Sequence, residues 1–386
     1  MEGHLVELRG KRGGRVWYLV FDNPRERGAK RQQERVRIGS MPKNHALARK
    51  REILRKVDKG TWVRERRDLT VERFLTDWLE AIKYDLATNT HVRYTGLVKQ
   101  HVIPRVGTLQ LAKLTPQHLT RIYQAVRAEG LSPQTALHVH RALHTALNYG
   151  VKVTKDLSEN VASRLKAPRV ERRVSTSITP EKVRTLIEAA RDTRLEVPVT
   201  LAALTGLRRG ELLALKWAWV NLDQGSLFVA EALEHTRGHG VAFKAPKSRT
   251  SRRVLRLAPE CVALLRAHKE AQDAVKAEAS EAYTDLDLVF PNPDGAPWPP
   301  DSFSVKFGKL ARTAGCQGFR LHDLRHSFAT LVLADSVSIR EVSEMLGHSN
   351  ASLTLSTYCH AVPGVGQAAV NNLARNLLGA EGAASP

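Results

Sequence analysis

Cysteine is scarce in this sequence, with only Cys261, Cys316 and Cys359 among 386 residues. The three thiols lie far apart and form no paired Cys-x-x-Cys spacing, which argues against a disulfide framework and against a cysteine-based zinc site. We therefore expect a protein without a metal site that works in a reducing compartment. The Cys359 thiol directly follows Tyr358 and is interpreted as a spectator.

Long hydrophobic runs are absent as well. No apolar stretch approaches the roughly 20 residues that a membrane-spanning helix needs, and the first residues lack the apolar centre of a signal peptide. A Gly-x-x-x-x-Gly-Lys phosphate loop is also missing. We expect a protein that uses no cofactor, contacts no membrane and stays in the cytoplasm.

What the sequence has in excess is positive charge. The 60 Lys and Arg residues face 39 Asp and Glu residues, which gives a formal net charge of +21. In residues 1–67, basic residues outnumber acidic ones by more than two to one. Such a balance favours association with a polyanion and says nothing about the fold. DNA is the leading candidate, and solubility or a generally basic proteome is the alternative explanation.

The chain is too long for one ordinary core, so we expect a multidomain protein that is mainly α-helical with small β elements. Residues 1–64 are predicted to form a small domain, in which strands at 16–21 and 35–38 precede a basic helix at 43–59. A small sheet with a basic helix is typical of a DNA-binding module. A solvated basic appendage is the alternative.

Residues 68–165 are predicted to form a helical domain, because apolar residues recur there at helical spacing. One helix is predicted at 88–102, ending before Pro104. Ser132 as the N-cap, with Pro133 at the first helical position, marks the start of a later helix.

The remainder of the chain is predicted to hold the largest unit. Residues 166–178 are basic and polar without periodicity and are interpreted as a linker. Residues 379–386, rich in Gly, Ala and Ser, are expected to be a disordered tail. Between them, 179–378 is predicted to be a mixed α+β unit with β-structure within 225–257 and helices at 259–278, 301–314, 322–334 and 338–346.

Several side chains of this unit suit the binding of a phosphodiester. Arg208 follows a Thr-Gly turn, and its guanidinium offers a planar donor fork for two phosphate oxygens; the neighbouring Arg209 is the competing choice. His322 and Arg325 are three residues apart and share a helix face. The histidine can move a proton near neutral pH, whereas the arginine only stabilises charge. A buried capping network would produce the same pair.

Further along the chain, His348 follows a helix that ends at a glycine, and Tyr358 comes ten positions later. A phenol has a pKa of about 10 and is a poor nucleophile until its proton is taken or its anion is stabilised. A single tyrosine is far more often structural than catalytic. The hypothesis therefore depends on the order and completeness of the whole set.

Together these residues resemble the tyrosine recombinases, that is, the phage-type integrases. The resemblance spans about 175 to 365. It implies an arm-type DNA-binding domain at 1–64, a SAM-like core-binding domain at 68–165 and a catalytic domain at 179–378. The matching segments are Thr-Gly-Leu-Arg-Arg-Gly-Glu-Leu at 205–212, Pro-Lys-Ser at 246–248, His-Asp-Leu-Arg-His at 322–326, Leu-Gly-His at 346–348 and Thr-Tyr-Cys-His at 357–360.

The resemblance implies roles for the residues around the phosphate. Arg208 and Arg325 would clamp the scissile phosphate and stabilise its transition state. Lys244 and Lys247 both lie in the predicted hairpin. Lys247 fits the family pattern better and would protonate the leaving 5′ oxygen.

The resemblance also implies how the strand is cut. His322 would act as acid and base toward the tyrosine, and His348 would hydrogen-bond the phosphate. Tyr358 would attack and form a 3′-phosphotyrosyl link. The link conserves the energy of the broken bond, so neither metal nor nucleotide is needed.

The activity implied is that of a site-specific DNA recombinase, an integrase of a phage or mobile element. Its partners would be double-stranded attachment sites and a homotetramer on synapsed DNA in the nucleoid of a bacterial host, with an excision or DNA-bending protein as a further candidate. A helix at 366–378 would dock on the neighbouring protomer or on its own domain. Two alternatives remain: strand relaxation like that of a type IB topoisomerase, and a catalytically silent architectural or regulatory DNA-binding protein.

Overall fold

The computed structural model describes residues 2–9, 15–22, 33–58, 68–170, 179–245, 251–335 and 337–348. The chain divides into two compact units, Met1–Arg172 and Arg173–Pro386. As predicted, the described part is mainly helical with small antiparallel sheets. The predicted final helix at 366–378, the tail at 379–386 and part of the linker lie outside the described residues.

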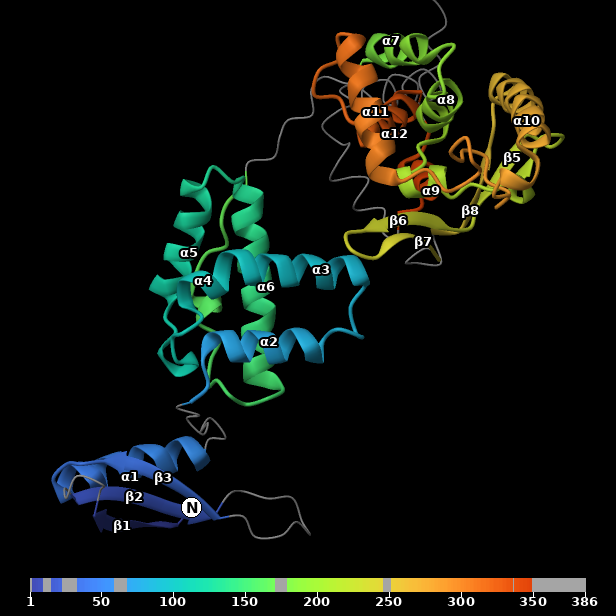
Figure 1. The fold of residues 1–386 in the computed structure, drawn as a ribbon. Helices are drawn as coiled ribbons and strands as arrows, with labels where there is room; N and C mark the ends of the chain where they lie inside the picture. The colour runs from blue at the N-terminus through green and yellow to red at the C-terminus, as the bar shows by residue number, and fades with distance from the viewer. Residues whose placement is uncertain are drawn as a thin grey trace, which may run out of the picture. The chain divides into compact units, whose positions relative to one another are not determined.

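The N-terminal segment is a three-stranded antiparallel sheet with one helix on it (Figure 1). Strand β2 is central, and its side chains at alternate positions, Leu19 and Phe21, are buried against Ile53 and Val57 of the helix. The predicted strands and the predicted basic helix are therefore confirmed. Their bounds are β1 (Gly3–Arg9), β2 (Arg15–Asp22), β3 (Gln33–Gly39) and α1 (Lys43–Asp58).

In the described range 68–170, the following segment consists of helices and their connections, with an isolated β-bridge between Thr70 and Gln110. Ser132 accepts a hydrogen bond from the backbone N–H of Thr135 at 3.2 Å, and Pro133 is the first helical residue, as predicted. The helices are α2 (Val71–Ala81), α3 (Thr88–Leu97), α4 (Ile103–Val106), α5 (Pro116–Ala128) and α6 (Pro133–Lys152), with a π-helical turn at Val98–Val102 and 3₁₀ turns at Leu111–Lys113 and Val161–Arg164.

The predicted end of a helix before Pro104 is wrong. Helix α3 passes into the π-helical turn and then into α4, where Pro104 stands in the first turn. A proline is tolerated there because the first backbone N–H groups of a helix have no partner within it. The chain therefore continues as a helix to Val106.

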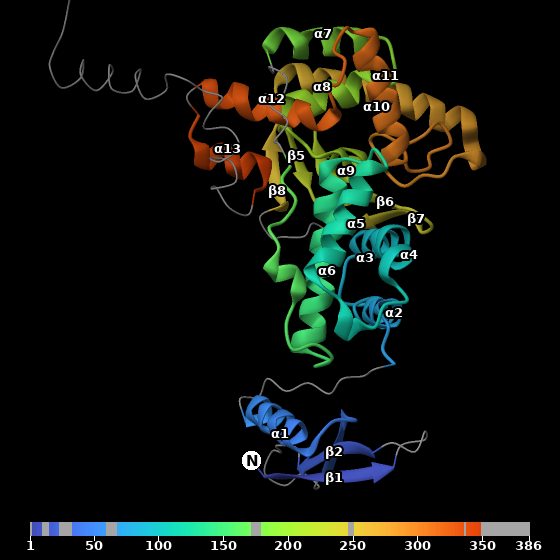
Figure 2. The same cartoon turned by 90° about the vertical axis from the view of Figure 1, so that its left-hand side faces the viewer.

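The core of the helical segment lies where three helices meet. Helices α2 and α3 cross α6 at a steep angle (Figure 1, Figure 2). Trp78 of α2 and Leu143 and Leu147 of α6 are each 1% exposed in this core. Their burial fits the helical spacing of the apolar residues in the sequence.

The second unit is a mixed α+β fold, as predicted. Strands β4, β5 and β8 form one antiparallel sheet in that order, and β6 and β7 form a separate hairpin. The strands are β4 (Val220–Asn221), β5 (Ser226–Val229), β6 (Ala232–Thr236), β7 (Gly240–Lys244) and β8 (Arg253–Arg256). The helices are α7 (Pro180–Ala190), α8 (Glu196–Thr205), α9 (Arg209–Leu213), α10 (Pro259–Ala279), α11 (Pro300–Thr313), α12 (Leu321–Ala334) and α13 (Ile339–Leu346), with 3₁₀ turns at Trp217–Trp219 and Ser280–Ala282.

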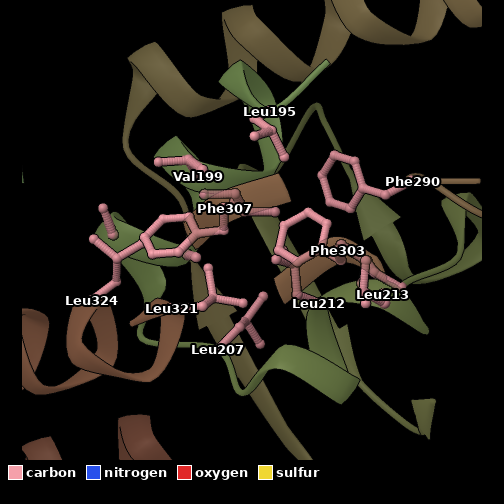
Figure 3. Packing of buried hydrophobic residues seen from close by; sticks show 14 of the residues in the cluster. Leu195, Val199, Leu207, Leu212, Leu213, Phe290, Phe303, Phe307, Leu321 and Leu324 are labelled. Atoms are coloured by element: carbon pink, nitrogen blue, oxygen red, sulfur yellow. The ribbon is translucent and has the colours of Figure 1, made fainter. Parts of the chain in front are cut away.

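A large apolar cluster holds most elements of the second unit together, and a smaller cluster packs α13 against α12. Leu212 of α9 and Leu324 of α12 are fully buried beside Phe303 and Phe307 of α11 (Figure 3). Fully burying one such side chain contributes about 1.5–3 kcal/mol relative to leaving it exposed. The cluster therefore fixes α9 and α12 relative to each other, and these helices carry Arg208 and Arg325 at or near their N-termini.

Candidate active site

Arg208 is placed by a tight reversal between α8 and α9. Gly206 ends α8 with φ 63°, in the left-handed region that favours glycine. A Cβ atom at this position would lie only 2.6 Å from the Phe328 ring of α12. The reversal brings α8 close to α12 and leaves Arg208 as the N-cap residue of α9.

A buried carboxylate holds the Arg208 guanidinium. Glu211 accepts the backbone N–H of Arg208 at 3.0 Å and its Nη1 at 2.6 Å. Arg208 Nη2 donates to the Gly347 carbonyl at 3.2 Å. The Arg208 side chain is 39% exposed and that of Glu211 is 4% exposed. Arg208 is thus oriented from the interior while remaining accessible to an anion.

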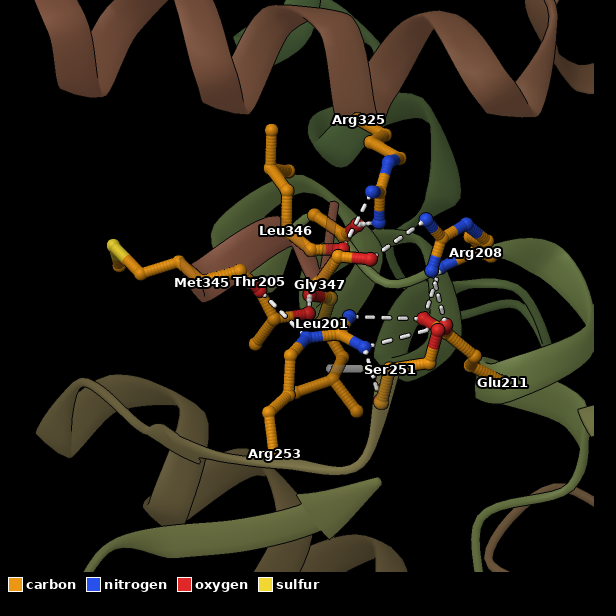
Figure 4. Close-up of polar contacts among 11 residues, drawn as sticks. Leu201, Thr205, Arg208, Glu211, Ser251, Arg253, Arg325, Met345, Leu346 and Gly347 are labelled. Atoms are coloured by element: carbon orange, nitrogen blue, oxygen red, sulfur yellow. Dashed lines mark hydrogen bonds and ion pairs between the residues drawn. The ribbon is translucent and has the colours of Figure 1, made fainter. Parts of the chain in front are cut away.

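Arg325 reaches the same place from α12, although it is only 2% exposed. Its Nη1 donates to the Gly206 carbonyl at 2.7 Å, and its Nη2 donates to the Leu346 carbonyl at 2.6 Å. The two arginines therefore bind consecutive carbonyls, Leu346 and Gly347, at the end of α13 (Figure 4). An incoming anion meets Arg208 first, because Arg325 lies buried.

The competing candidate, Arg209, points to a different element. Its Nη1 donates to Ser304 Oγ at 2.7 Å and to the Pro300 carbonyl at 3.1 Å, both in α11. It also pairs with Asp301 at 3.2 Å. These contacts give Arg209 a role in joining α9 to α11 and favour Arg208 as the phosphate ligand.

His348 directly follows the turn that binds both arginines. Gly347 has φ 64° and ends α13, as predicted, and the backbone N–H of His348 donates to the Ser343 carbonyl at 3.0 Å. Loss of hydration and the positive charges of Arg325 and Arg208 lower the pKa of His348 to about 4. The ring is therefore neutral at pH 7 in the absence of DNA.

His322 lies one helical turn from His326, and the two rings meet edge to face with centroids 4.7 Å apart. His322 is exposed on the surface of α12, yet protein atoms crowd its ring. Partial loss of hydration, His326 and Arg325 lower the pKa of His322 to about 4. A neutral imidazole can accept a proton, which an imidazolium cannot.

Asp323 fixes the start of α12. It is 5% exposed and accepts the backbone N–H of Arg320 at 2.7 Å and its Nη2 at 3.0 Å. The arrangement repeats that of Arg208 and Glu211: an acid at the third helical position holds the arginine before the helix. The first turns of both helices are thereby tied down where the site residues project.

Sequence reasoning missed two members of this network, Glu211 as an orienting residue and Arg253. The Glu211 carboxylate binds Arg253 at 2.9 and 3.3 Å. Burial opposes ionisation of Glu211, but Arg253 and Arg208 outweigh it, and the pKa of the carboxyl falls below its ordinary value. The sequence holds one indication of the position of Arg253. It is two residues before Leu255, so both side chains lie on the same, inner face of β8.

The other predicted residues cannot be placed in the same way. Lys247 and Tyr358 lie outside the described residues. Lys244, the alternative to Lys247, is on β7, and its Nζ pairs with Glu234 of β6 at 2.8 Å. This pairing within the hairpin gives Lys244 a structural partner.

The arrangement can bind and stabilise a compact anion. The guanidiniums of Arg208 and Arg325 converge on the end of α13, which His348 follows, and hydrogen bonds set the positions of both arginines before any ligand arrives. Such preorganised donors stabilise charge that develops in a transition state. Within the described ranges, no group of three or more His, Cys, Asp or Glu side chains is spaced to hold a metal ion. No helix there has the length and apolar composition needed to cross a bilayer.

Two family models match this chain. The model described as the phage integrase family matches residues 176–363, and the model described as the phage integrase N-terminal SAM-like domain matches residues 70–126. Both segments occur in the order that the sequence predicts.

Relatives match over most of their length. An integrase of Saccharopolyspora erythraea is 27% identical, over 86% of this chain and 88% of the relative. A XerC-like tyrosine recombinase of Caldanaerobacter subterraneus subsp. tengcongensis is 26% identical, over 83% of this chain and 86% of the relative.

Solved structures share the fold. The Tn1549 transposon integrase in complex with transposon right end DNA has a TM-score of 0.65 and 18% identity, covering 79% of this chain and 100% of that one. A lambda integrase tetramer bound to a Holliday junction has a TM-score of 0.54 and 18% identity, covering 87% and 92%. Because its helical and α+β parts match two models of one family in order, this chain belongs to the phage integrase family, the tyrosine-type site-specific recombinases.

Proposed function

We propose that this site-specific recombinase integrates or excises a phage or other mobile element, with Tyr358 as the nucleophile that cuts DNA. The observation that carries the proposal is the pair of consecutive carbonyls at the end of α13. Leu346 and Gly347 hold Arg325 and Arg208, and His348 is the next residue. Tyr358 comes only ten positions further along the chain.

The proposed first step forms one bond and breaks one. The Tyr358 oxygen attacks the phosphorus and passes its proton to His322. The bond from phosphorus to the 5′ oxygen breaks, and Lys247 gives that oxygen a proton. Arg208 from its exposed position and Arg325 from its buried one stabilise the extra negative charge, and His348 hydrogen-bonds the phosphate.

The proposed second step reverses the first on another strand. A 5′ hydroxyl of the partner strand passes its proton to Lys247 and attacks the phosphorus, the bond from phosphorus to the tyrosine oxygen breaks, and His322 returns a proton to that oxygen. His322 is suited to both steps, because a neutral imidazole takes the proton and the resulting imidazolium returns it. A bound phosphate raises the histidine pKa toward the range where such transfer is efficient.

The finer assignments are also proposals. Double-stranded attachment sites would be the substrate, a homotetramer on two synapsed duplexes the active assembly, and an excision or DNA-bending protein an accessory partner. The high positive charge supports DNA as the partner. We place the protein with the nucleoid DNA in the cytoplasm of a bacterial host.

A library of nicked duplexes with a random central segment tests the proposal on many candidate sites at once. The nick lets a short fragment diffuse away after cleavage, which traps the covalent complex. We expect wild-type protein to form adducts that survive SDS and share a common sequence. The Tyr358→Phe variant is expected to bind the same duplexes and form no adduct.

The outcomes separate the three hypotheses. Binding without any adduct from wild type would favour a catalytically silent DNA-binding protein. Adducts with no preferred sequence, together with relaxation of supercoiled plasmid, would favour topoisomerase-like activity. Adducts that Tyr358→Phe still forms would refute the assignment of the nucleophile.

A further inference from the structure

Arg253 is an arginine whose side chain is buried at the start of a strand. It begins β8, directly after the described residues resume at Ser251, and its side chain is only 7% exposed. Arginine is almost never fully buried unless it is paired. In the register of the sheet it faces the buried Val229, and its strand neighbour Val254 is 63% exposed.

The Arg253 guanidinium joins three segments of the chain (Figure 4). Nη2 and Nη1 donate to the two Glu211 oxygens at 2.9 and 3.3 Å. Nε donates to the Met345 carbonyl at 2.6 Å, and Nη1 also donates to the Ser251 carbonyl at 3.0 Å. Arg253 thus links α9, the end of α13 and Ser251.

The contacts of Arg253 complete a pattern at the end of α13. Three consecutive carbonyls, those of Met345, Leu346 and Gly347, accept hydrogen bonds from Arg253, Arg325 and Arg208 in that order. The C-terminal end of a helix carries partial negative charge, which favours cations there. A shift of Arg253 would therefore be felt at both of the other arginines.

Arg253 also shares its acid with Arg208. The carboxylate of Glu211 receives Arg253 on both oxygens and Arg208 Nη1 on one of them at 2.6 Å. With Arg253 in place, the carboxylate is held in one orientation. Without it, Glu211 keeps only its bonds to the Arg208 backbone N–H and Nη1, so the carboxylate can shift toward Arg208 and draw that guanidinium away from an incoming phosphate.

We infer that Arg253 is a positioning residue for strand cleavage, which acts through Glu211 and the end of α13 to aim Arg208 at the scissile phosphate. The inference rests on the proposed function, in which Arg208 binds that phosphate. Because the Arg253 side chain is only 7% exposed, we expect it to make no contact with DNA. Its loss should therefore slow the chemical step and leave DNA affinity unchanged.

The test compares Arg253→Lys with wild type in two measurements on the full chain. One is the single-turnover rate of adduct formation on a nicked duplex selected by wild type, and the other is the affinity for that duplex. Lysine keeps the charge but lacks the planar fork that binds two carboxylate oxygens. We expect the affinity of Arg253→Lys for the duplex to be within about twofold of wild type. Its cleavage should be slower by roughly 100-fold, because a misplacement of a catalytic group such as the Arg208 guanidinium by about 1 Å has an effect of that size.

Arg256→Lys is the matched control. Arg256 lies on the same strand, is exposed and makes one hydrogen bond, to the Gln224 carbonyl at 3.4 Å. Both of its measured quantities should equal those of wild type.

A modified substrate separates positioning from a structural role. A methylphosphonate at the scissile position removes one negatively charged oxygen. The orientation of the Arg208 guanidinium therefore contributes less to the cleavage rate on this substrate. The rate difference between wild type and Arg253→Lys should shrink on this substrate. A general loss of folded protein would lower both rates by the same factor.

Each outcome decides the inference. Wild-type cleavage by a folded Arg253→Lys, or an equal factor of loss on both substrates, overturns it. Arg253→Gln is the second variant if lysine does not support folding, because its amide nitrogen takes the place of the arginine Nε that donates to the Met345 carbonyl. Failure of both to fold would make Arg253 a structural residue. If wild type itself forms no adduct, the proposed function fails instead.

Discussion

At the scale of single residues, the buried carboxylate of Glu211 contributes both to the stability of the fold and to the orientation of the site arginine Arg208. It caps α9, pairs with Arg253 and holds Arg208, all with 4% of its side chain exposed. Removing one partner of a buried ion pair leaves the other charge uncompensated, whereas exposed pairs contribute little. Stability and orientation therefore depend on the same side chain.

Substitution of Glu211→Gln is expected to lower the free energy of unfolding by about 3 kcal/mol, because two arginines lose their counter-charge. Urea unfolding followed by circular dichroism measures the change. The control is Asp223→Asn, which breaks the exposed pair with Arg266 and should cost about 1 kcal/mol or less. Equal effects of the two substitutions would contradict the buried pairing.

The two site histidines predict a pH dependence of stability. The folded-state pKa of His322 and of His348 is lowered to about 4, against an ordinary value near 6.5. Between these values the unfolded chain binds more protons than the folded one, so stability falls as pH drops from about 6.5 to about 4. Above the ordinary value, the contribution of these groups is constant.

Nuclear magnetic resonance of the imidazole protons measures the pKa values of His322 and His348 directly. Without DNA, both histidines should titrate near pH 4, and their midpoints should rise when a phosphodiester binds. Midpoints near 6.5 for the site histidines in free protein would show that burial and the neighbouring arginines do not lower their pKa.

At the scale of elements, the turn between α8 and α9 is the most constrained connection. Gly206→Ala is expected to destabilise the protein by well over 1 kcal/mol, because it combines left-handed backbone strain with a clash against Phe328 at 2.6 Å. Gly315→Ala is the matched control. Its φ of 69° is similar, and no atom lies within 4 Å of its Cβ position.

Thermal unfolding of the two variants tests this account of the turn. Gly315→Ala should show only the backbone cost of about 1–2 kcal/mol. Gly206→Ala should show a clearly larger loss and also slower DNA cleavage, because the Gly206 carbonyl accepts Arg325. Similar melting temperatures for the two variants would mean that α8 and α12 are not in close contact there.

Local signals explain which elements the sequence predicts well. Ser132 with Pro133 begins α6 as predicted, because cap and first-turn preferences act within a few residues. Thr179 with Pro180 begins α7 in the same way. The passage of the chain through Pro104 was not predictable, since it depends on a π-helical turn stabilised by the surrounding core.

The same reasoning applies to the site. Arg208 and the residues of α12 stand in compact motifs, so their chemistry is visible in the sequence. The role of Arg253 depends on Glu211, which is 42 residues away, and on the carbonyl of Met345, 92 residues away. Contacts over such separations leave no local pattern beyond the alternation of a strand.

At the scale of the whole molecule, the net charge of +21 predicts binding that depends strongly on salt. Each phosphate contact releases counterions, so affinity for duplex DNA should fall by roughly 1000-fold or more between about 50 and 200 mM salt. Fluorescence anisotropy with a labelled duplex measures the slope. A nearly flat dependence would contradict an extensive phosphate interface.

The central claim is that DNA is cut by forming a covalent bond to Tyr358. Mass spectrometry of peptides from the SDS-resistant adduct locates that bond, after nuclease digestion leaves a small nucleotide remnant on the protein. The predicted result is a 3′-linked remnant on the peptide that contains Tyr358. A remnant on any other residue, or the absence of a covalent complex from every selected duplex, would contradict the claim.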